Sequence, residues 1–480
     1  MLTLVVIFLP LLFSAILFGL RKSQIAWRIA LMGALAELVV TLIAFVGFDT
    51  QNVFNYTSDL NWISRLGVNF SFAMDGISLL MVGLTATLVP IIILADSKHN
   101  PVRPGSFYGL IMFMQSALMG VFTATDGLLF YIFWEAALLP IFFIVSMWGG
   151  ENRVKITLKF FIYTIFGSLF MLVALVYLYS LTPAPQSFSF QSLYALDLSL
   201  SQQLFVGLSF FLAFAVKIPI FPFHTWQPNT YVVAPMAGSM LLSGIMLKMG
   251  VYGMLRLMVP LLPEAMSQYG IYGIVLAVIG LIYASIIAIN QQEVKRLIAY
   301  SSLAHVGLIA AAVLTATAGS ISGAVVQMIA HGVNVVGMFM IANIFLLRTQ
   351  TTQISNLGGI AAIAPRFAIF FMVVMLGSVA LPLTSGFPGE FMMLAGLFAY
   401  NPYIAAVAGV SVILGAVYMF RLYQRSMYAE LKVEKFEDLD TTESVAAIII
   451  VALILVFGLY PGFITSLAEP AINALLAYKA

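Results

Sequence analysis

The sequence predicts an all-α membrane protein with 14 transmembrane helices, and three observations support this fold class. First, 62% of the 480 residues are hydrophobic and only 8% are charged, and the mean hydropathy is +1.06; soluble domains do not have this balance. Second, apolar stretches of about 20 residues, the length that crosses a bilayer, recur along the whole chain. Third, the connections between these stretches alternate between many and few basic residues. An even number of spans places both termini on the same side of the membrane.

The spans are read from apolar stretches separated by charged, glycine-rich or proline-rich connections. The first, Leu2–Leu20, has no basic segment before it and no small-residue cleavage site after it, so we expect a retained span rather than a signal peptide. Two long stretches contain internal prolines, Pro219 and Pro382, which break a helix. The predicted spans lie near residues 2–20, 27–48, 73–95, 107–125, 127–148, 157–181, 202–231 (broken), 235–259, 269–290, 294–315, 320–347, 366–400 (broken), 402–424 and 443–463.

Basic residues fall mainly on one side of this arrangement. That side carries 16 of the 21 lysines and arginines, the other side carries Arg65, Arg256 and Lys479, and Lys217 and Lys248 remain inside the membrane. The positive-inside rule then places both termini outside and residues 421–443 in the cytoplasm. The most charged stretch, residues 429–440, is expected to be a solvated loop, with a docking surface as the alternative. The basic side collects Arg21, Lys22, Arg28, Lys98, Arg103, Arg153, Lys155, Lys159, Lys295, Arg296, Arg348, Arg366, Arg421, Arg425, Lys432 and Lys435.

Lys217 and Lys248 are the residues hardest to explain by packing. A lysine near the middle of a bilayer costs roughly 2.5–3.5 kcal/mol, and Lys217 stands beside the break at Pro219. Irregular backbone persists at membrane depth only inside protein or beside water. These residues therefore predict a polar, partly hydrated ion path, although Lys248 could instead be a packing lysine that reaches for a carbonyl.

Further ionisable residues extend the predicted ion path. Glu135 lies at mid-span among aromatic residues, Glu390 follows the break of the twelfth span, and His305 and His331 lie in the tenth and eleventh. Gln327, His331 and Asn334 share one helix face, as do Ser301 and His305, and these faces must point into the bundle. Each residue also has a structural interpretation. Glu135 could form a simple ion pair, Glu390 could cap a half-helix, and both histidines could be satisfied core residues.

Four other acidic residues are expected to lie outside the predicted ion path. Glu37, in the second span, is expected at the periphery or at an interface. Asp75, Asp96 and Asp126 fall at span ends, where a charge is inexpensive.

The composition also excludes several function classes. A net charge of +2 gives no indication of nucleic-acid binding, and the absence of cysteine excludes disulfides, cysteine-ligated iron–sulfur clusters and thiol catalysis. No nucleotide-binding glycine motif is present. The histidines are isolated, with no carboxylate at ligand spacing, so no metal site is predicted.

The two broken spans indicate an internal repeat. Pro219 and Pro382 are 163 residues apart and stand in K-I-P-I-F-P and A-L-P-L-T-S-G-F-P-G-E. Broken helices in corresponding positions of two halves are typical of transporters built from inverted repeats. Because the offset is five spans, the second unit enters the membrane from the opposite side.

With these residues assembled, the chain resembles the antiporter-like subunits of proton-pumping NADH:quinone oxidoreductase (respiratory complex I). The resemblance covers most of residues 70–425. It is carried by FAMDGISLL (72–80), FYIFWEAALLPIFF (130–143), MWGGENRVKITLKFFIYTIFGS (147–168), KIPIFPFHTWQP (217–228), APMAGSMLLSGIMLKMGVYG (234–253), EVKRLIAYSSLAHVGLI (293–309), GAVVQMIAHG (323–332) and LPLTSGFPGEFM (381–392).

The resemblance implies two inverted five-helix repeats, helices 4–8 and 9–13, with helices 7 and 12 broken. The corresponding division is residues 1–105 as an N-terminal three-helix segment, 106–260 as the first repeat, 261–428 as the second, and 429–480 as a cytoplasmic loop and helix 14. Within the family the chain is most similar to subunit M (NuoM). Subunits L and N carry lysine where Glu390 stands, and subunit L also has a long C-terminal lateral helix.

The resemblance also implies roles for individual residues. Glu135 is the partner of the broken-helix Lys217, Lys248 is the next relay, His305 and His331 line the central axis, and Glu390 is the terminal group. This subunit would be a non-redox translocase subunit that moves protons, driven by quinone reduction elsewhere. NADH, flavin, iron–sulfur clusters and quinone would lie on partner chains, and subunits L and N would be neighbours in the bilayer of a bacterial inner membrane.

The mechanism expected from these roles is a switch in charge. When Glu135 approaches, Lys217 takes up a proton; when Glu135 is drawn away, the proton moves toward Lys248, the histidines and Glu390. One departure from the family concerns residues 229–231, Asn-Thr-Tyr, where Asp-Ala-His or similar is usual; their loss argues against proton entry through that loop. The alternatives are a subunit of a multi-component cation/proton antiporter and a non-transporting membrane scaffold.

Overall fold

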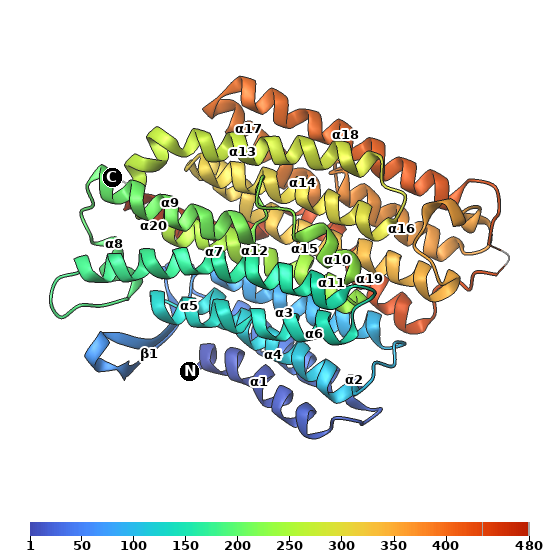
Figure 1. Cartoon of the computed structure of the whole chain (residues 1–480), viewed down its shortest axis with the longest axis horizontal. Coiled ribbons are helices and arrows are strands. Elements are labelled where there is room, and N and C mark those ends of the chain that lie inside the picture. Colours follow the sequence, from blue (N-terminus) through green and yellow to red (C-terminus); the bar gives the residue numbers. More distant parts are fainter. Residues whose placement is uncertain (434, 479–480) are drawn as a thin grey trace.

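Long helices run side by side along one axis in the computed structural model, which describes residues 1–433 and 435–478 (Figure 1). Within these residues, 13 helices are long and apolar enough to cross a membrane. The fourteenth predicted span is the broken one, formed by α16 and α17, neither of which is long enough alone. The prediction of 14 membrane-crossing units in an all-α membrane fold is therefore confirmed.

The bounds of the elements follow the predicted spans to within a few residues in most cases. They are α1 Leu2–Gly19, α2 Ala26–Val46, β1 Asn55–Ile63, β2 Val68–Met74, α3 Gly76–Asp96, α4 Pro104–Thr123, α5 Gly127–Ala136, α6 Leu138–Trp148, α7 Arg153–Leu181, α8 Phe190–Tyr194, α9 Leu200–Lys217, α10 Gln227–Val233, α11 Met236–Leu241, α12 Leu247–Gly253, α13 Pro263–Ile289, α14 Val294–Leu314, α15 Ala318–Thr349, α16 Pro365–Ser378, α17 Gly386–Tyr400, α18 Pro402–Met427, α19 Thr441–Leu459 and α20 Gly462–Ala477.

The N-terminus and the described C-terminal end lie at the same end of the bundle, at the left of Figure 1. We call this the terminal end, and the opposite end, where the connections with most of the lysines and arginines lie, the basic end. Lys479, one of the basic residues assigned to the terminal side, lies outside the described residues.

Besides the short helix α8, two elements at the terminal end were not predicted. Strands β1 and β2 pair as an antiparallel hairpin, and Gly67 makes the turn with a positive φ of 59°, which glycine adopts without strain. The third span consequently starts at Gly76 rather than at 73, because Asp75 caps the helix by accepting a hydrogen bond from Ser78 N. The second unpredicted element, α20, packs against α3 and α15.

Each of the two broken spans is interrupted near its middle. In the seventh span the helix stops at Lys217, Pro219 has a φ of 27°, and the chain becomes helical again at Gln227. The indole Nε1 of Trp226 donates to Val216 O at 2.9 Å, so one carbonyl freed by the break is satisfied inside protein, as membrane depth requires. The twelfth span has the same form, with α16 and α17 separated by residues 379–385.

The eighth span, residues 236–258, is the most buried helix of the bundle. Its α-helical segments α11 and α12 alternate with two π-helical turns, Leu242–Met246 and Met254–Met258, a distortion that is frequent at functional sites. α3, α4, α14 and α15 are nearly as buried, whereas α1, α2, α18 and α19 are largely exposed. The core of the bundle is therefore the eighth span with α3, α4, α14 and α15, and it includes the helices that carry Lys248, His305 and His331.

Candidate functional site

Lys217 is the last residue of α9, directly before the break, and only 3% of its surface is exposed. Its Nζ lies 5.2 Å from the centre of the Trp134 ring, a cation–π contact that stabilises a charged lysine. Glu135 is the next residue on α5, but the two side chains form no ion pair. Oε1 of Glu135 is buried without a hydrogen-bond partner among the described residues. The predicted Glu135–Lys217 pair is thus adjacent but separated.

Gly250 brings the eighth span close to this break. A Cβ atom at this position would lie 2.5 Å from Cγ1 of Ile218 and 3.3 Å from Cβ of Lys217. The first of these distances is shorter than real carbon atoms allow, so only glycine permits this approach. Lys248 stands two residues earlier on the same helix, which places the two lysines on neighbouring elements without a direct hydrogen bond.

Lys248 is 1% exposed and has two acceptors. Its Nζ donates to Ser243 O at 2.6 Å and lies 2.8 Å from Nδ1 of His331. Ser243 belongs to the first π-helical turn, and this wider turn points the carbonyl oxygen of Ser243 at the lysine. When Lys248 is an ammonium group, which only donates, Nδ1 of His331 is the acceptor and the ring of His331 is neutral, with its proton on Nε2.

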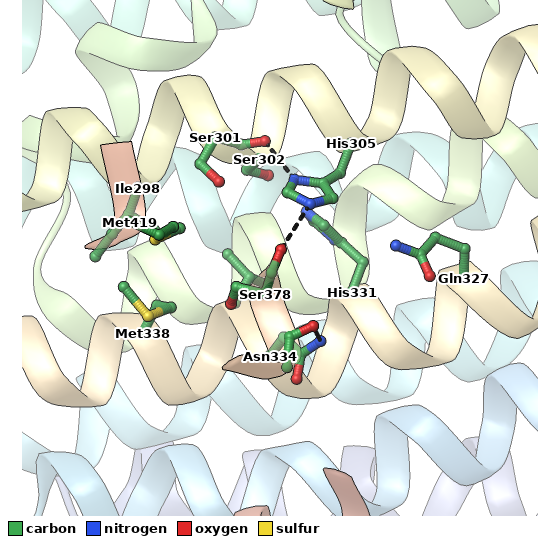
Figure 2. Close-up of a pocket in the computed structure, with 12 residues that line it drawn as sticks. Ile298, Ser301, Ser302, His305, Gln327, His331, Asn334, Met338, Ser378 and Met419 are labelled. Atoms are coloured by element: carbon green, nitrogen blue, oxygen red, sulfur yellow. Dashed lines mark hydrogen bonds between the residues drawn. The ribbon is translucent and has the colours of Figure 1, made fainter. Parts of the chain in front are cut away.

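His305 has the opposite surroundings, as Figure 2 shows. Its Nδ1 lies 2.7 Å from Ser301 O, and its Nε2 lies 3.1 Å from Ser378 O and 3.3 Å from Oε1 of Glu390. Acceptor oxygens face both ring nitrogens, an arrangement that favours the doubly protonated imidazolium form of His305. The His305 and His331 rings are neighbours, with centroids 5.7 Å apart.

Glu390, on α17 just after the second break, completes the series. It is 7% exposed, its Oε1 lies 3.3 Å from Nε2 of His305, and it accepts a hydrogen bond from Nε2 of Gln327 at 3.4 Å. Small cavities lie on both sides of His305, each with about 20 Å³ open to the centre of a water-sized sphere. A cavity of this size holds a water molecule. One is lined by His331 and Gln327 (Figure 2) and the other by Glu390 and Tyr418.

The structure thus brings four of the six predicted site residues into one series of neighbours, Lys248–His331–His305–Glu390. Glu135 and Lys217 form a second group at the first break. Trp134 was not singled out from the sequence, although it stands beside Glu135 in the aromatic stretch that flanks it.

Two expectations about the other carboxyl groups were wrong. Asp75, Asp96 and Asp126 were expected to be inexpensive at span ends; they do lie at helix ends, but they are only 1%, 3% and 0% exposed. Asp75 pairs with Arg256, 181 residues away in sequence. Glu37 was expected at the periphery or an interface, but it is fully buried inside the bundle. Both of its carboxyl oxygens lack hydrogen-bond partners among the described residues. Sequence position alone did not reveal which neighbours surround these groups.

Within residues 1–433 and 435–478, no three histidine, cysteine or acidic side chains gather as metal ligands would.

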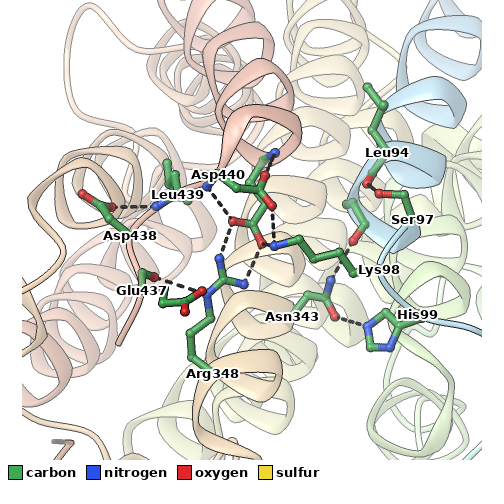
Figure 3. Close-up of polar contacts among 12 residues, drawn as sticks. Leu94, Ser97, Lys98, His99, Asn343, Arg348, Glu437, Asp438, Leu439 and Asp440 are labelled. Carbon is green, nitrogen blue, oxygen red and sulfur yellow. Dashed lines mark hydrogen bonds and ion pairs between the residues drawn. The ribbon is translucent and has the colours of Figure 1, made fainter. Parts of the chain in front are cut away.

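The charged stretch 429–440 contacts the basic end of the bundle through its acidic side chains. Asp438 accepts from two backbone N–H groups at the start of α16, and Asp440 caps α19 and pairs with Lys98. Beside them lies Arg348 (Figure 3). Its guanidinium binds both carboxylate oxygens of Glu443, at 2.7 and 2.5 Å. The segment is therefore partly bonded to the bundle and partly exposed; its Glu434 lies outside the described residues.

Comparisons with known proteins agree with this geometry. The family described as "NADH:quinone oxidoreductase/Mrp antiporter, TM" matches residues 124–415. NADH-quinone oxidoreductase subunit M of Rickettsia typhi is 38% identical over 488 residues, covering 98% of each protein. A chain of respiratory complex I from Thermus thermophilus superposes with a TM-score of 0.92 and 31% identity, covering 100% of this chain and 99% of that one. A chain of the Mrp complex from Dietzia has a TM-score of 0.85 at 20% identity, and this chain spans 52% of it; that likeness concerns the fold alone.

Proposed function

The chain belongs to the family of antiporter-like membrane subunits of NADH:quinone oxidoreductase, in its subunit M group, and from this membership we propose how its buried residues move protons. It is a multi-pass membrane-arm subunit of complex I and takes part in proton translocation as part of that translocase. With no cysteine in the chain, its own contribution is proton transfer between side chains.

We infer that Glu135, Lys217, Lys248, His331, His305 and Glu390 form the proton path. The observation that carries this proposal is the series of neighbours from Lys248 to Glu390, with contacts of 2.8 Å at one end and 3.3 Å at the other and, between them, two imidazole rings whose centroids are 5.7 Å apart. A neutral imidazole accepts a proton at one nitrogen and releases another from its second nitrogen, which is the property a relay needs.

Loading of this series begins at Lys217. Its charge is stabilised by the Trp134 face at 5.2 Å and by the carboxylate of Glu135, whose free Oε1 marks where a closer ion pair can form. When Glu135 approaches, Lys217 holds a proton; when Glu135 withdraws, the buried ammonium loses its stabilising charge and its proton moves to Lys248. Gly250 is the element that keeps the two lysine-bearing helices close enough for this transfer.

The energy needed to move one proton across the membrane is smaller than the interaction energy of a buried ion pair. Moving one charge against 100 mV takes about 2.3 kcal/mol. Removing one partner from a buried ion pair changes its energy by about 3–5 kcal/mol. If Glu135 moves in to pair with Lys217 and then withdraws, the energy exchanged is therefore sufficient to drive one proton across.

The same family membership supports further proposals about the surroundings of the chain. NADH, flavin, iron–sulfur clusters and quinone are held by partner chains, and subunits of the L and N type are the direct neighbours. The protein lies in a bacterial inner membrane with its terminal end outside and its basic end in the cytoplasm, in agreement with the positive-inside rule. The division at residues 105, 260 and 428 gives each five-helix repeat one broken helix.

Replacement of the first pair of residues tests the function. In the whole complex reconstituted into vesicles, we expect Lys217→Met and Glu135→Gln to reduce proton accumulation per NADH oxidised. The matched controls are Lys155→Met and Glu151→Gln, exposed residues at the basic end, which should pump normally. Undiminished accumulation in both buried-site variants would refute the proposed path.

A multi-component antiporter subunit was the alternative, and it is supported by the family description, which also names the Mrp antiporter, and by the fold similarity to the Mrp chain. Purification separates the two functions, because flavin-bearing and iron–sulfur-bearing chains accompany a complex I subunit, whereas only other membrane chains accompany an antiporter subunit.

A further inference from the structure

A buried ion pair at the terminal end lies outside the path described above. Asp75, at the start of α3, and Arg256, in the second π-helical turn, are 1% and 4% exposed. The guanidinium binds the carboxylate through two hydrogen bonds of 2.5 Å each. The planar fork of arginine fits a carboxylate in this way, so the positive charge is held at a fixed place between the helices.

This pair continues a polar line that starts at Lys248. Lys248, Tyr252 and Arg256 are spaced i, i+4 and i+8 and so share one helix face. The hydroxyl of Tyr252 donates to Phe122 O at 2.8 Å and lies 3.0 Å from Oγ of Ser78. Nη2 of Arg256 donates to the same Oγ at 2.9 Å. Hydrogen-bonding groups therefore lead from the middle of the eighth span toward the terminal end without involving Glu390.

A cavity adjoins the ion pair on that side. About 40 Å³ of it is open to the centre of a water-sized sphere, which is room for more than one water molecule. The side chains of Asp75, Arg256, Tyr194 and Tyr252 line it, and so does Tyr478, which is 49% exposed at the terminal end. The cavity thus connects the ion pair with the surface of the bundle.

We propose that the Asp75–Arg256 pair is a gate on a second proton path, which joins Lys248 to the terminal end. A fixed guanidinium in a narrow polar passage repels protons, as arginine does in other selective pores. Asp75 keeps that charge in place, and Tyr252 with Ser78 supplies the hydroxyl groups on the inner side. The closed gate keeps protons outside the membrane from returning to Lys248; this step rests on the proposed function, in which Lys248 carries protons.

Passive proton leakage tests the gate independently of pumping. The whole complex is reconstituted into vesicles without NADH, a pH difference is imposed, and its decay is followed with an internal dye. The double variant Asp75→Asn with Arg256→Gln removes both charges together and so leaves no unpaired buried ion. We expect its leak to be several-fold faster than that of the wild type, and we expect the added change Lys248→Met to return the leak to the wild-type rate.

The matched control is Asp59→Asn, an exposed acidic residue of β1 at the same end, which should leave the vesicles tight. Ser78→Ala is the milder variant, because it keeps both charges and removes one partner of the guanidinium; its leak should lie between those of the wild type and the double variant. Vesicles as tight as the wild type in both gate variants, or a leak that Lys248→Met does not change, would overturn the gate. Neither result bears on the pumping defects of the Lys217 and Glu135 variants, so failure of the gate and failure of the proposed function are distinguishable.

Discussion

Replacing His331 tests the contact on which the proposed proton path depends most. Lys248 has two acceptors among the described residues, Ser243 O at 2.6 Å and Nδ1 of His331 at 2.8 Å. His331→Leu removes the second acceptor and the relay together. His331→Gln retains an acceptor for the lysine but has no group that takes up a proton at pH 7. The two variants therefore separate a relay from a residue that only positions Lys248.

The size of the effect follows from the hydrogen bond that is lost. A hydrogen bond to a charged group contributes about 1.5–3 kcal/mol, and every 1.4 kcal/mol is a factor of about ten. We therefore expect His331→Leu to reduce the occupancy of the charged form of Lys248, and with it the pumping rate, by about 10- to 100-fold. His331→Gln keeps this bond, so a similarly large loss in that variant measures the relay itself.

The assay compares two rates in the same membrane vesicles, NADH oxidation and quenching of a pH-sensitive dye. The control is His99→Leu, which removes a histidine at the basic end that contacts Oδ1 of Asn343 at 2.8 Å and lies outside the path. A wild-type ratio of the two rates in His331→Leu would refute the path. Normal pumping in His331→Gln alone would show that the residue positions Lys248 without carrying protons.

Three further predictions concern the surroundings of the path. Trp134→Leu removes the cation–π contact with Lys217, worth about 0.5–2 kcal/mol, and should lower pumping severalfold in the same vesicles, whereas Trp134→Phe should retain most of it. Arg348→Leu leaves Glu443 buried without its bidentate partner and should destabilise the protein by about 3–5 kcal/mol, measured as loss of assembled complex and a lower Tm. The backbone N–H of Glu443 and the ammonium of Lys98 hold the pKa of Asp440 below its usual range against the effect of partial burial. Its stabilising effect is therefore present above the ordinary carboxyl pKa and lost as the pH falls through the lowered one. Tm should fall less steeply in Asp440→Asn than in the wild type over that acidic range.

The membrane-crossing helices were predictable because one physical requirement, a run of apolar residues long enough for the bilayer, fixes them. The elements missed at the terminal end obey weaker rules. α20 has only 16 residues and lies below the length that identifies a span, and the β1–β2 hairpin is short, with most of β1 exposed. Its one clear sign was Gly67, at the turn between two runs of β-forming residues.

The candidate site was predictable only as a set of residue types. An ionisable side chain inside a span shows that a polar environment exists, but its partner is set by helix packing between distant segments. Arg256 and Asp75 are 181 residues apart, and each was placed at the end of a different span. Whether a carboxyl group is paired, as for Asp75, or unpaired, as for Glu37, depends on contacts that no spacing in the sequence expresses.

In the proposed path, the surroundings of the two histidines also favour one order of proton transfer. His305 faces acceptors at both nitrogens, which favours its charged form, whereas an ammonium on Lys248 requires a neutral His331. If Lys248 gave its proton to His331 first, two imidazolium rings would stand 5.7 Å apart. At an effective dielectric constant of 20, their repulsion is about 3 kcal/mol, more than the roughly 2.3 kcal/mol needed to move a charge against 100 mV. Transfer of the His305 proton to Glu390, 3.3 Å away, removes this repulsion. The path therefore empties at Glu390 before Lys248 discharges, and blocking Glu390 should trap the proton on Lys248 rather than on His331.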